Sequence, residues 1–100
     1  MVEIKLQPNN YLTALREMFP EVKFEKGRKG QLEHVIGECK EALAEIPEDG
    51  SMPGTNYMLE IIDVIHTAAN VLYKSGYSEE AIGMGIMAVQ AKNHERGYYK

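Results

Sequence analysis

The sequence has few of the features that would place it in a membrane or outside a cell. It contains a single cysteine, so it cannot form an intramolecular disulfide, and this suits a reducing compartment. No window of about 18 apolar residues is free of charge. The N-terminus has no basic segment followed by an apolar run, as a signal peptide would. We therefore expect a cytoplasmic protein without a membrane span.

Basic charge is also scarce. The chain carries 11 Lys and Arg against 15 Asp and Glu, a formal net charge of −4, which disfavours nucleic acid as a default partner. This balance still allows an anionic ligand, because a bound cation can invert the local field. With 100 residues, of which 44% are hydrophobic, the chain is long enough for one domain with a packed core. We expect residues 1–100 to form that single domain.

Strand patterns are weak, and turn residues divide the chain into helical segments. A short helix is predicted over residues 11–19, capped by Asn9 or Asn10 and followed by Pro20. Apolar residues then recur at spacings of three, four and seven over residues 31–46, which is helical periodicity. The segment PEDGSMPG ends this second helix.

Two more helices complete the prediction. Thr55 or Asn56 caps a helix that runs to residue 74, and Gly76 terminates it. Ser78, followed by two glutamates, begins a last helix that ends near residue 94. The predicted fold class is therefore all-α: a small helical bundle with one short N-terminal helix and three longer ones. Its two parts are the N-terminal helix and loop, 1–30, and the motif-bearing core, 31–99.

The helix predicted over residues 55–74 is almost entirely apolar, yet it contains Glu60 and Asp63. A lone carboxylate is costly to bury, so such groups are normally paired, protonated or bound to a metal. On a helical wheel both belong to one polar stripe on an otherwise apolar rod. A second polar stripe, within about 60° of the wheel, lies on the preceding helix and consists of His34, Glu38, Glu41 and Glu45.

The short connection between these helices predicts an antiparallel hairpin in which the two stripes face each other. Glu38, Glu41, Glu60 and Asp63 would then converge, and their mutual repulsion would be large. A divalent cation removes that repulsion, and ligands that are all oxygen suit Mg²⁺ or Mn²⁺. Mg²⁺ usually coordinates substrate phosphates as well. The alternative is that each acidic pair lies on a solvated face and pairs with Lys or Arg.

The remaining polar features are less specific. The basic segment 26–30, KGRKG, lacks the strand and the GK[ST] ending of a P-loop, which favours a solvated loop over a phosphate contact. His34 is expected on a polar helix face, from which it could join the site. Cys39 lies on the apolar side of its helix and is expected to be a small buried residue. His66 lies off the acidic stripe and is expected to have no role.

The last predicted helix is apolar on nearly every side and contains Gly83 and Gly85. Each interior glycine costs about 1 kcal/mol relative to alanine, which close approach of another helix could offset. A monomer of this length can hardly bury this helix together with the helix over residues 55–74. We therefore expect a homo-oligomer packed through these two helices.

The two acidic motifs resemble a known signature. Glu38-x-x-Glu41 and Glu60-x-x-Asp63, separated by eighteen residues, are similar to the motifs of the MazG-like all-α nucleoside triphosphate pyrophosphohydrolases. The segment AKNHERGYY, 91–99, resembles the Lys/Asn-x-x-Arg segment that follows the last long helix in that family, in phage-type members especially.

The resemblance implies a helical bundle that assembles as a dimer or tetramer. It also implies Mg²⁺-dependent hydrolysis of a nucleoside or deoxynucleoside triphosphate between its α- and β-phosphates, which yields a monophosphate and pyrophosphate. Lys92 and Arg96 resemble the residues that neutralise phosphate, and Asn93 resembles a polar contact to the nucleotide. The implied metal ligands are Glu38, Glu41, Glu60 and Asp63. Either Glu38 or Glu41 would also orient the attacking water.

The resemblance covers residues 31–99 and departs from the family pattern at one place. Gly37 stands where members commonly have a further acidic residue. A second interpretation therefore remains open, in which the chain is a non-catalytic helical oligomerisation or adaptor module that keeps the fold. Salt bridges from Lys or Arg to each carboxylate would favour that interpretation.

Overall fold

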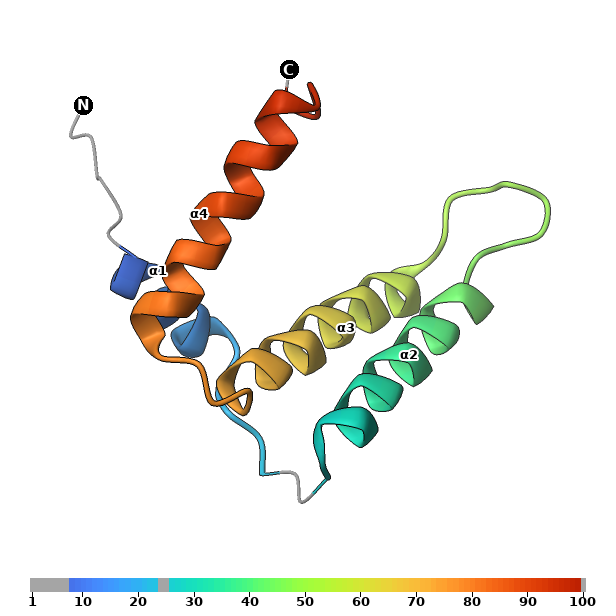
Figure 1. Cartoon of the computed structure of the whole chain (residues 1–100). Helices are drawn as coiled ribbons and strands as arrows, with labels where there is room; N and C mark the ends of the chain where they lie inside the picture. Colours follow the sequence, from blue (N-terminus) through green and yellow to red (C-terminus); the bar gives the residue numbers. More distant parts are fainter. Residues whose placement is uncertain (1–7, 24–25, 100) are drawn as a thin grey trace. The chain divides into compact units, whose positions relative to one another are not determined.

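The structure is a computed structural model that describes residues 8–23 and 26–99, and within these ranges every regular element is an α-helix (Figure 1). The helices are α1, Pro8–Met18; α2, Arg28–Ala44; α3, Thr55–Tyr73; and α4, Glu79–Glu95. Their lengths of 11, 17, 19 and 17 residues confirm the all-α class, with one short helix and three longer ones. None of these helices combines the length and apolar character needed to cross a bilayer.

The chain divides into two compact units, which are described separately. One unit contains α1 and α4 and is formed by the chain up to Phe19 together with the chain from Gly76 onward. The other, Pro20–Ser75, contains α2 and α3. The expectation of a single domain stays a prediction.

The α2–α3 unit is a helical hairpin, and residues 45–54 connect its two helices (Figure 1). The helices run antiparallel, as the short connection predicts. The side chains buried in this unit are small or polar: Gln31, Ala42, Thr67, Ala69 and Asn70. The hairpin therefore turns polar positions of α3 toward α2, which agrees with the expected facing stripes.

Large apolar side chains of the hairpin lie on the outside instead. Leu43 of α2 is 65% exposed. The other exposed large apolar residues of α2 and α3 are Leu32, Ile36, Met58, Leu59, Ile61, Ile62, Ile65 and Leu72. Cys39 shares this outer side of α2 and is exposed, so the prediction of a buried cysteine is wrong. The apolar stripe of α2 is not the face that contacts α3.

α2 begins earlier than predicted, inside the basic segment 26–30. Gly27 precedes the helix in an extended conformation, and Arg28 and Lys29 form the first turn. Both are good helix formers, so they extend the helix N-terminally from the apolar pattern. The expected solvated loop is therefore restricted to residues before Arg28.

The chain that leads into α2 is fastened to α3. The Val22 N–H donates to Asn70 Oδ1 at 2.6 Å, and His66 Nε2 lies 2.8 Å from the Pro20 carbonyl oxygen. Asn70 is 1% exposed, so its amide is a buried anchor for the incoming chain. His66, for which the sequence predicted no role, helps to hold the same segment.

The other unit pairs α1 with α4. Leu12 is fully buried, and Ile82 and Gly83 are the buried residues of α4. Gly83 thus lies where close packing is expected, whereas Gly85 is exposed. The predicted cap of α4 is confirmed, because Ser78 Oγ accepts from the Ala81 N–H at 3.1 Å.

Candidate metal centre

Three carboxylates converge between the helices of the hairpin. Glu38 of α2 and Glu60 and Asp63 of α3 each offer one oxygen atom, and these oxygens lie within 4.8 Å of one another. The i, i+3 spacing on α3 puts Glu60 and Asp63 on one face. The antiparallel hairpin then sets Glu38 against them. Three of the four predicted metal ligands are therefore brought together.

Glu38 is the most enclosed of these carboxylates, with a side chain only 12% exposed. Its Oε1 lies 3.3 Å from His34 Nε2, one helical turn earlier. Its Oε2 is buried without a hydrogen-bond partner in the described part of the chain. Burial, and then the neighbouring Asp63 and Glu41 carboxyls, raise the pKa of Glu38 from 4.5 to about 7. A buried oxygen in this state requires a proton or a cation.

Glu41 lies at the exposed edge of this cluster. It is not among the three converging residues, yet its charge raises the pKa of both Glu38 and Glu60. For Glu60, burial is the larger cause of the raised pKa, and the Glu41 carboxyl is the next. Glu41 is therefore close enough to act on the centre, and its role as a metal ligand stays a prediction.

No Lys or Arg within residues 8–23 and 26–99 forms an ion pair with Glu38, Glu60 or Asp63. The ion pairs that Lys and Arg do form lie elsewhere, between Arg16 and Glu79 and between Lys29 and Glu33. The arrangement thus lacks the salt bridges that the solvated-face alternative requires.

The donor set fits a divalent cation. Three carboxylates from two helices converge, and one of them, Glu38, has a buried and unpartnered oxygen; carboxylate oxygens are the hard ligands that Mg²⁺ and Mn²⁺ prefer. A bound cation would offset the repulsion that raises the pKa of Glu38. The oxygen ligands do not select Mg²⁺ over other hard divalent cations.

The predicted substrate-binding residues are in the α1–α4 unit. Lys92 and Asn93 lie in the last turn of α4, and the Arg96 N–H donates to the Lys92 carbonyl at 3.2 Å, so the helical turn continues to Arg96. Lys92 and Arg96 therefore share one face. Asn93 Nδ2 donates to Tyr99 Oη at 3.4 Å, which ties the C-terminal segment to α4. The role of all three toward a nucleotide stays a prediction.

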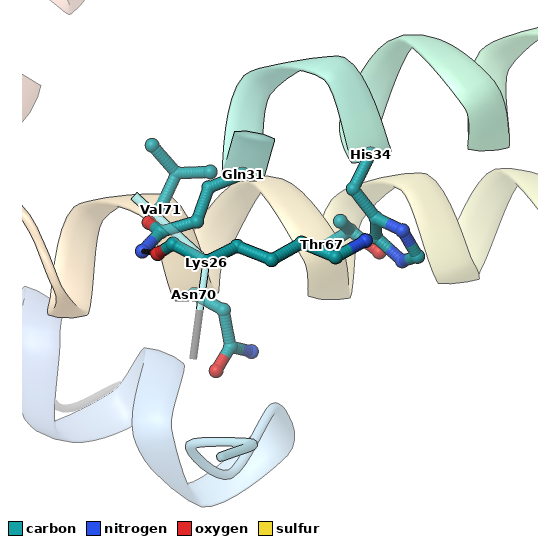
Figure 2. Close-up of a pocket in the computed structure, with 6 residues that line it drawn as sticks. All are labelled: Lys26, Gln31, His34, Thr67, Asn70 and Val71. Atoms are coloured by element: carbon teal, nitrogen blue, oxygen red, sulfur yellow. Dashed lines mark hydrogen bonds between the residues drawn. The ribbon is translucent and has the colours of Figure 1, made fainter. Parts of the chain in front are cut away.

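The direction of the Lys26 side chain was not predicted from the sequence. Figure 2 shows a small pocket between α2 and α3 in which the Lys26 side chain extends toward His34. Thr67 and Asn70 line the same pocket from α3. Gln31 Nε2 donates to the Lys26 carbonyl at 2.8 Å, so the backbone at Lys26 is held against α2. The sequence contains the basic segment 26–30, but its pattern does not show which of the basic side chains extends into the pocket.

Comparison of the chain with protein-family models, with curated proteins and with solved structures finds no match. The resemblance to MazG-like enzymes therefore rests on the motifs themselves.

Proposed function

We propose that this protein is a Mg²⁺-dependent nucleoside triphosphate pyrophosphohydrolase that cleaves a nucleoside or deoxynucleoside triphosphate between the α- and β-phosphates. The observation that carries the proposal is the convergence of Glu38, Glu60 and Asp63 around a buried, unpartnered oxygen of Glu38. The resemblance of the two acidic motifs supports the same reaction.

In this proposal Glu38, Glu60 and Asp63 hold the cation, and Glu41 completes or borders the ligand set. A bound Mg²⁺ or Mn²⁺ would supply a Lewis acid to phosphate oxygens and would offset their negative charge. Glu41 or Glu38 orients a water molecule and accepts its proton as the oxygen of this water attacks the α-phosphorus. The bond from the α-phosphorus to the bridging oxygen breaks, and pyrophosphate leaves with that oxygen. Lys92 and Arg96 neutralise phosphate charge, and Asn93 contacts the nucleotide.

The proposed enzyme is a cytoplasmic homo-oligomer, either a dimer or a tetramer. The exposed apolar side chains of the hairpin, Leu43 among them, form the kind of surface that a second copy would cover. Sedimentation velocity over a range of protein concentrations tests this assembly. A monomer at every concentration would contradict it.

Release of pyrophosphate from the eight common ribo- and deoxyribonucleoside triphosphates tests the activity, with Mg²⁺ and with a chelator. We expect Mg²⁺-dependent release from at least one of them. Glu60→Gln should abolish this release, because it removes a charge from the centre. Glu48→Gln is the matched control, since Glu48 is exposed in the loop between the helices.

A folded, oligomeric protein that releases no pyrophosphate would contradict the proposed function. That result would favour the second candidate, a non-catalytic helical oligomerisation or adaptor module. The observation in favour of this candidate is the extent of exposed apolar surface on α2 and α3.

A further inference from the structure

A solvent-open cavity of about 380 Å³ runs along α2 beside the carboxylates. Lys26 and Gly30 line it near the start of α2, Glu38 and Glu41 line it farther along the helix, and Glu33 and His34 line it between them. From Gly30, next to Lys26, to Glu38 the helix rises by about 12 Å. The cavity therefore extends along α2 from one lysine to the carboxylates of the candidate metal centre, with the Glu33 carboxylate also in its wall.

Two glycines, Gly30 and Gly37, form part of the cavity wall. They are seven residues apart and so lie on the same face of α2. A Cβ atom built on Gly37 would meet no atom within 4 Å, so this position borders open space. Glycine is disfavoured in a helix interior relative to alanine. Here it keeps the cavity wide beside Glu38.

Lys26 gives the cavity its positive charge. Among the described residues that line the cavity, it is the one Lys or Arg, and its side chain points along α2 toward His34 (Figure 2). No described residue forms an ion pair with it. Since Gly27 precedes α2 without a side-chain cap, the N–H groups of the first turn of α2 add positive potential near the start of the helix.

We propose that this cavity holds the pyrophosphate portion of the nucleotide and that Lys26 binds its phosphate oxygens. The proposal rests on the proposed function, because Mg²⁺ at the carboxylates would take some of its ligands from the substrate phosphates. The substrate phosphates that share Mg²⁺ with the protein would then lie beside Glu38. The cavity adjoins these carboxylates, and Lys26, whose side chain extends toward His34, offers positive charge to a phosphate beside them.

Binding of pyrophosphate itself tests this assignment without turnover. Isothermal titration calorimetry with pyrophosphate and Mg²⁺ would compare the wild type with Lys26→Met. Loss of a charge-assisted phosphate contact should weaken binding by about tenfold or more. Lys29→Met removes the same charge from a residue that is paired with Glu33 and does not line the cavity, so it should change binding less than about twofold. Lys26→Arg should retain most of the affinity.

A second variant fills the cavity instead of removing charge. Gly37→Leu places its side chain in open space, so the fold should persist while pyrophosphate binding is lost. Gly85→Leu is the matched control, because Gly85 is also a helical glycine with no atom within 4 Å of a built Cβ atom, but it lies on α4. Both variants should keep the binding of Mg²⁺ alone, and their thermal midpoints should not fall below that of the wild type, because leucine replaces a glycine inside a helix.

The outcomes separate this inference from the proposed function. If Lys26→Met and Gly37→Leu bind pyrophosphate as the wild type does, or if the wild type does not bind it, the cavity assignment is overturned even when nucleotide hydrolysis is found. If both variants lose pyrophosphate binding in a protein that hydrolyses none of the eight nucleotides, the cavity assignment is supported and the proposed function fails.

Discussion

The raised pKa of Glu38 predicts how the stability of the metal-free protein depends on pH. The pKa is about 7 in the folded chain against an ordinary value of 4.5, so between these values the folded state binds more protons than the unfolded state. The free energy of unfolding must then fall as the pH rises from 4.5 to 7. The contribution of Glu38 is complete below pH 4.5 and is lost above pH 7.

The size of this effect has an upper limit. The difference between the two pKa values corresponds to at most about 3 kcal/mol. The cluster lies near the surface and solvent screens its charges, so we expect about 1–2 kcal/mol. For a domain of this size, each 1 kcal/mol moves the thermal midpoint by about 4–8 °C. The midpoint should therefore drop by about 4–16 °C between pH 5 and pH 8 through Glu38 alone.

The assay is thermal unfolding followed by circular dichroism, with chelator present, at pH values from 5 to 8. Other groups titrate as well, so the informative quantity is the difference between the wild type and Glu38→Gln, which keeps the shape but cannot ionise. Glu48→Gln, in the exposed loop, is the control. His34→Gln tests whether the histidine beside Glu38 contributes to the same pH range.

Addition of Mg²⁺ at pH 8 should reverse the loss of stability, by about 2.7 kcal/mol at a hundred times the dissociation constant. It should do so in the wild type and much less in Glu38→Gln. Parallel pH profiles for the wild type and Glu38→Gln would refute the reasoning, because they would mean that ionisation of Glu38 does not destabilise the folded state.

Three further substitutions test the packing within the two units. Asn70→Ala should destabilise the protein by about 1–3 kcal/mol, because it leaves the Val22 N–H without its buried acceptor; the exposed Asn56→Ala is the control, and thermal melting measures both. Leu12→Ala should cost about 2–5 kcal/mol and should speed hydrogen exchange first in α1 and α4, which a uniform loss of protection would contradict. Gly85→Ala should raise the free energy of unfolding by about 0.5–1 kcal/mol, and an unchanged or lower midpoint would show that this glycine is needed in contacts with other molecules.

The sequence predicts the order and approximate limits of the helices, because helix limits depend on local chemistry. The predicted caps of α1 and α3 are wrong: α1 begins at Pro8, so Asn9 and Asn10 lie inside it, and Gly54 precedes α3 without a side-chain cap. Ser78 caps α4 through its own hydroxyl group, and Gly76 ends the preceding segment with a φ of 89°, which glycine adopts readily. The facing acidic stripes were also predictable. A spacing of three or four fixes one helix face, and a short connection leaves an antiparallel arrangement as the simplest one.

The sequence does not show how deeply each side chain is buried within the hairpin. Glu38 and Glu41 are one turn apart on the same stripe, yet Glu38 is nearly buried and Glu41 is exposed. The bond between Val22 and Asn70 joins residues 48 positions apart, so no local pattern announces it. Cys39 was misplaced for a related reason, because an apolar stripe shows which residues share a face but not what that face contacts.

The hairpin has an unusual distribution of side chains, and it connects the proposed site to the proposed assembly. The buried apolar residues of the described hairpin are two alanines, Ala42 and Ala69, which contribute little hydrophobic free energy. Its interior is given to polar groups that build the carboxylate centre and anchor the incoming chain, while Leu43 and similar residues remain outside. A helix pair of this kind gains too little from its own contact to offset the conformational entropy of its residues. We infer that burial of the outer apolar face supplies the missing stability, and that assembly thereby allows the interior to be used for a charged centre.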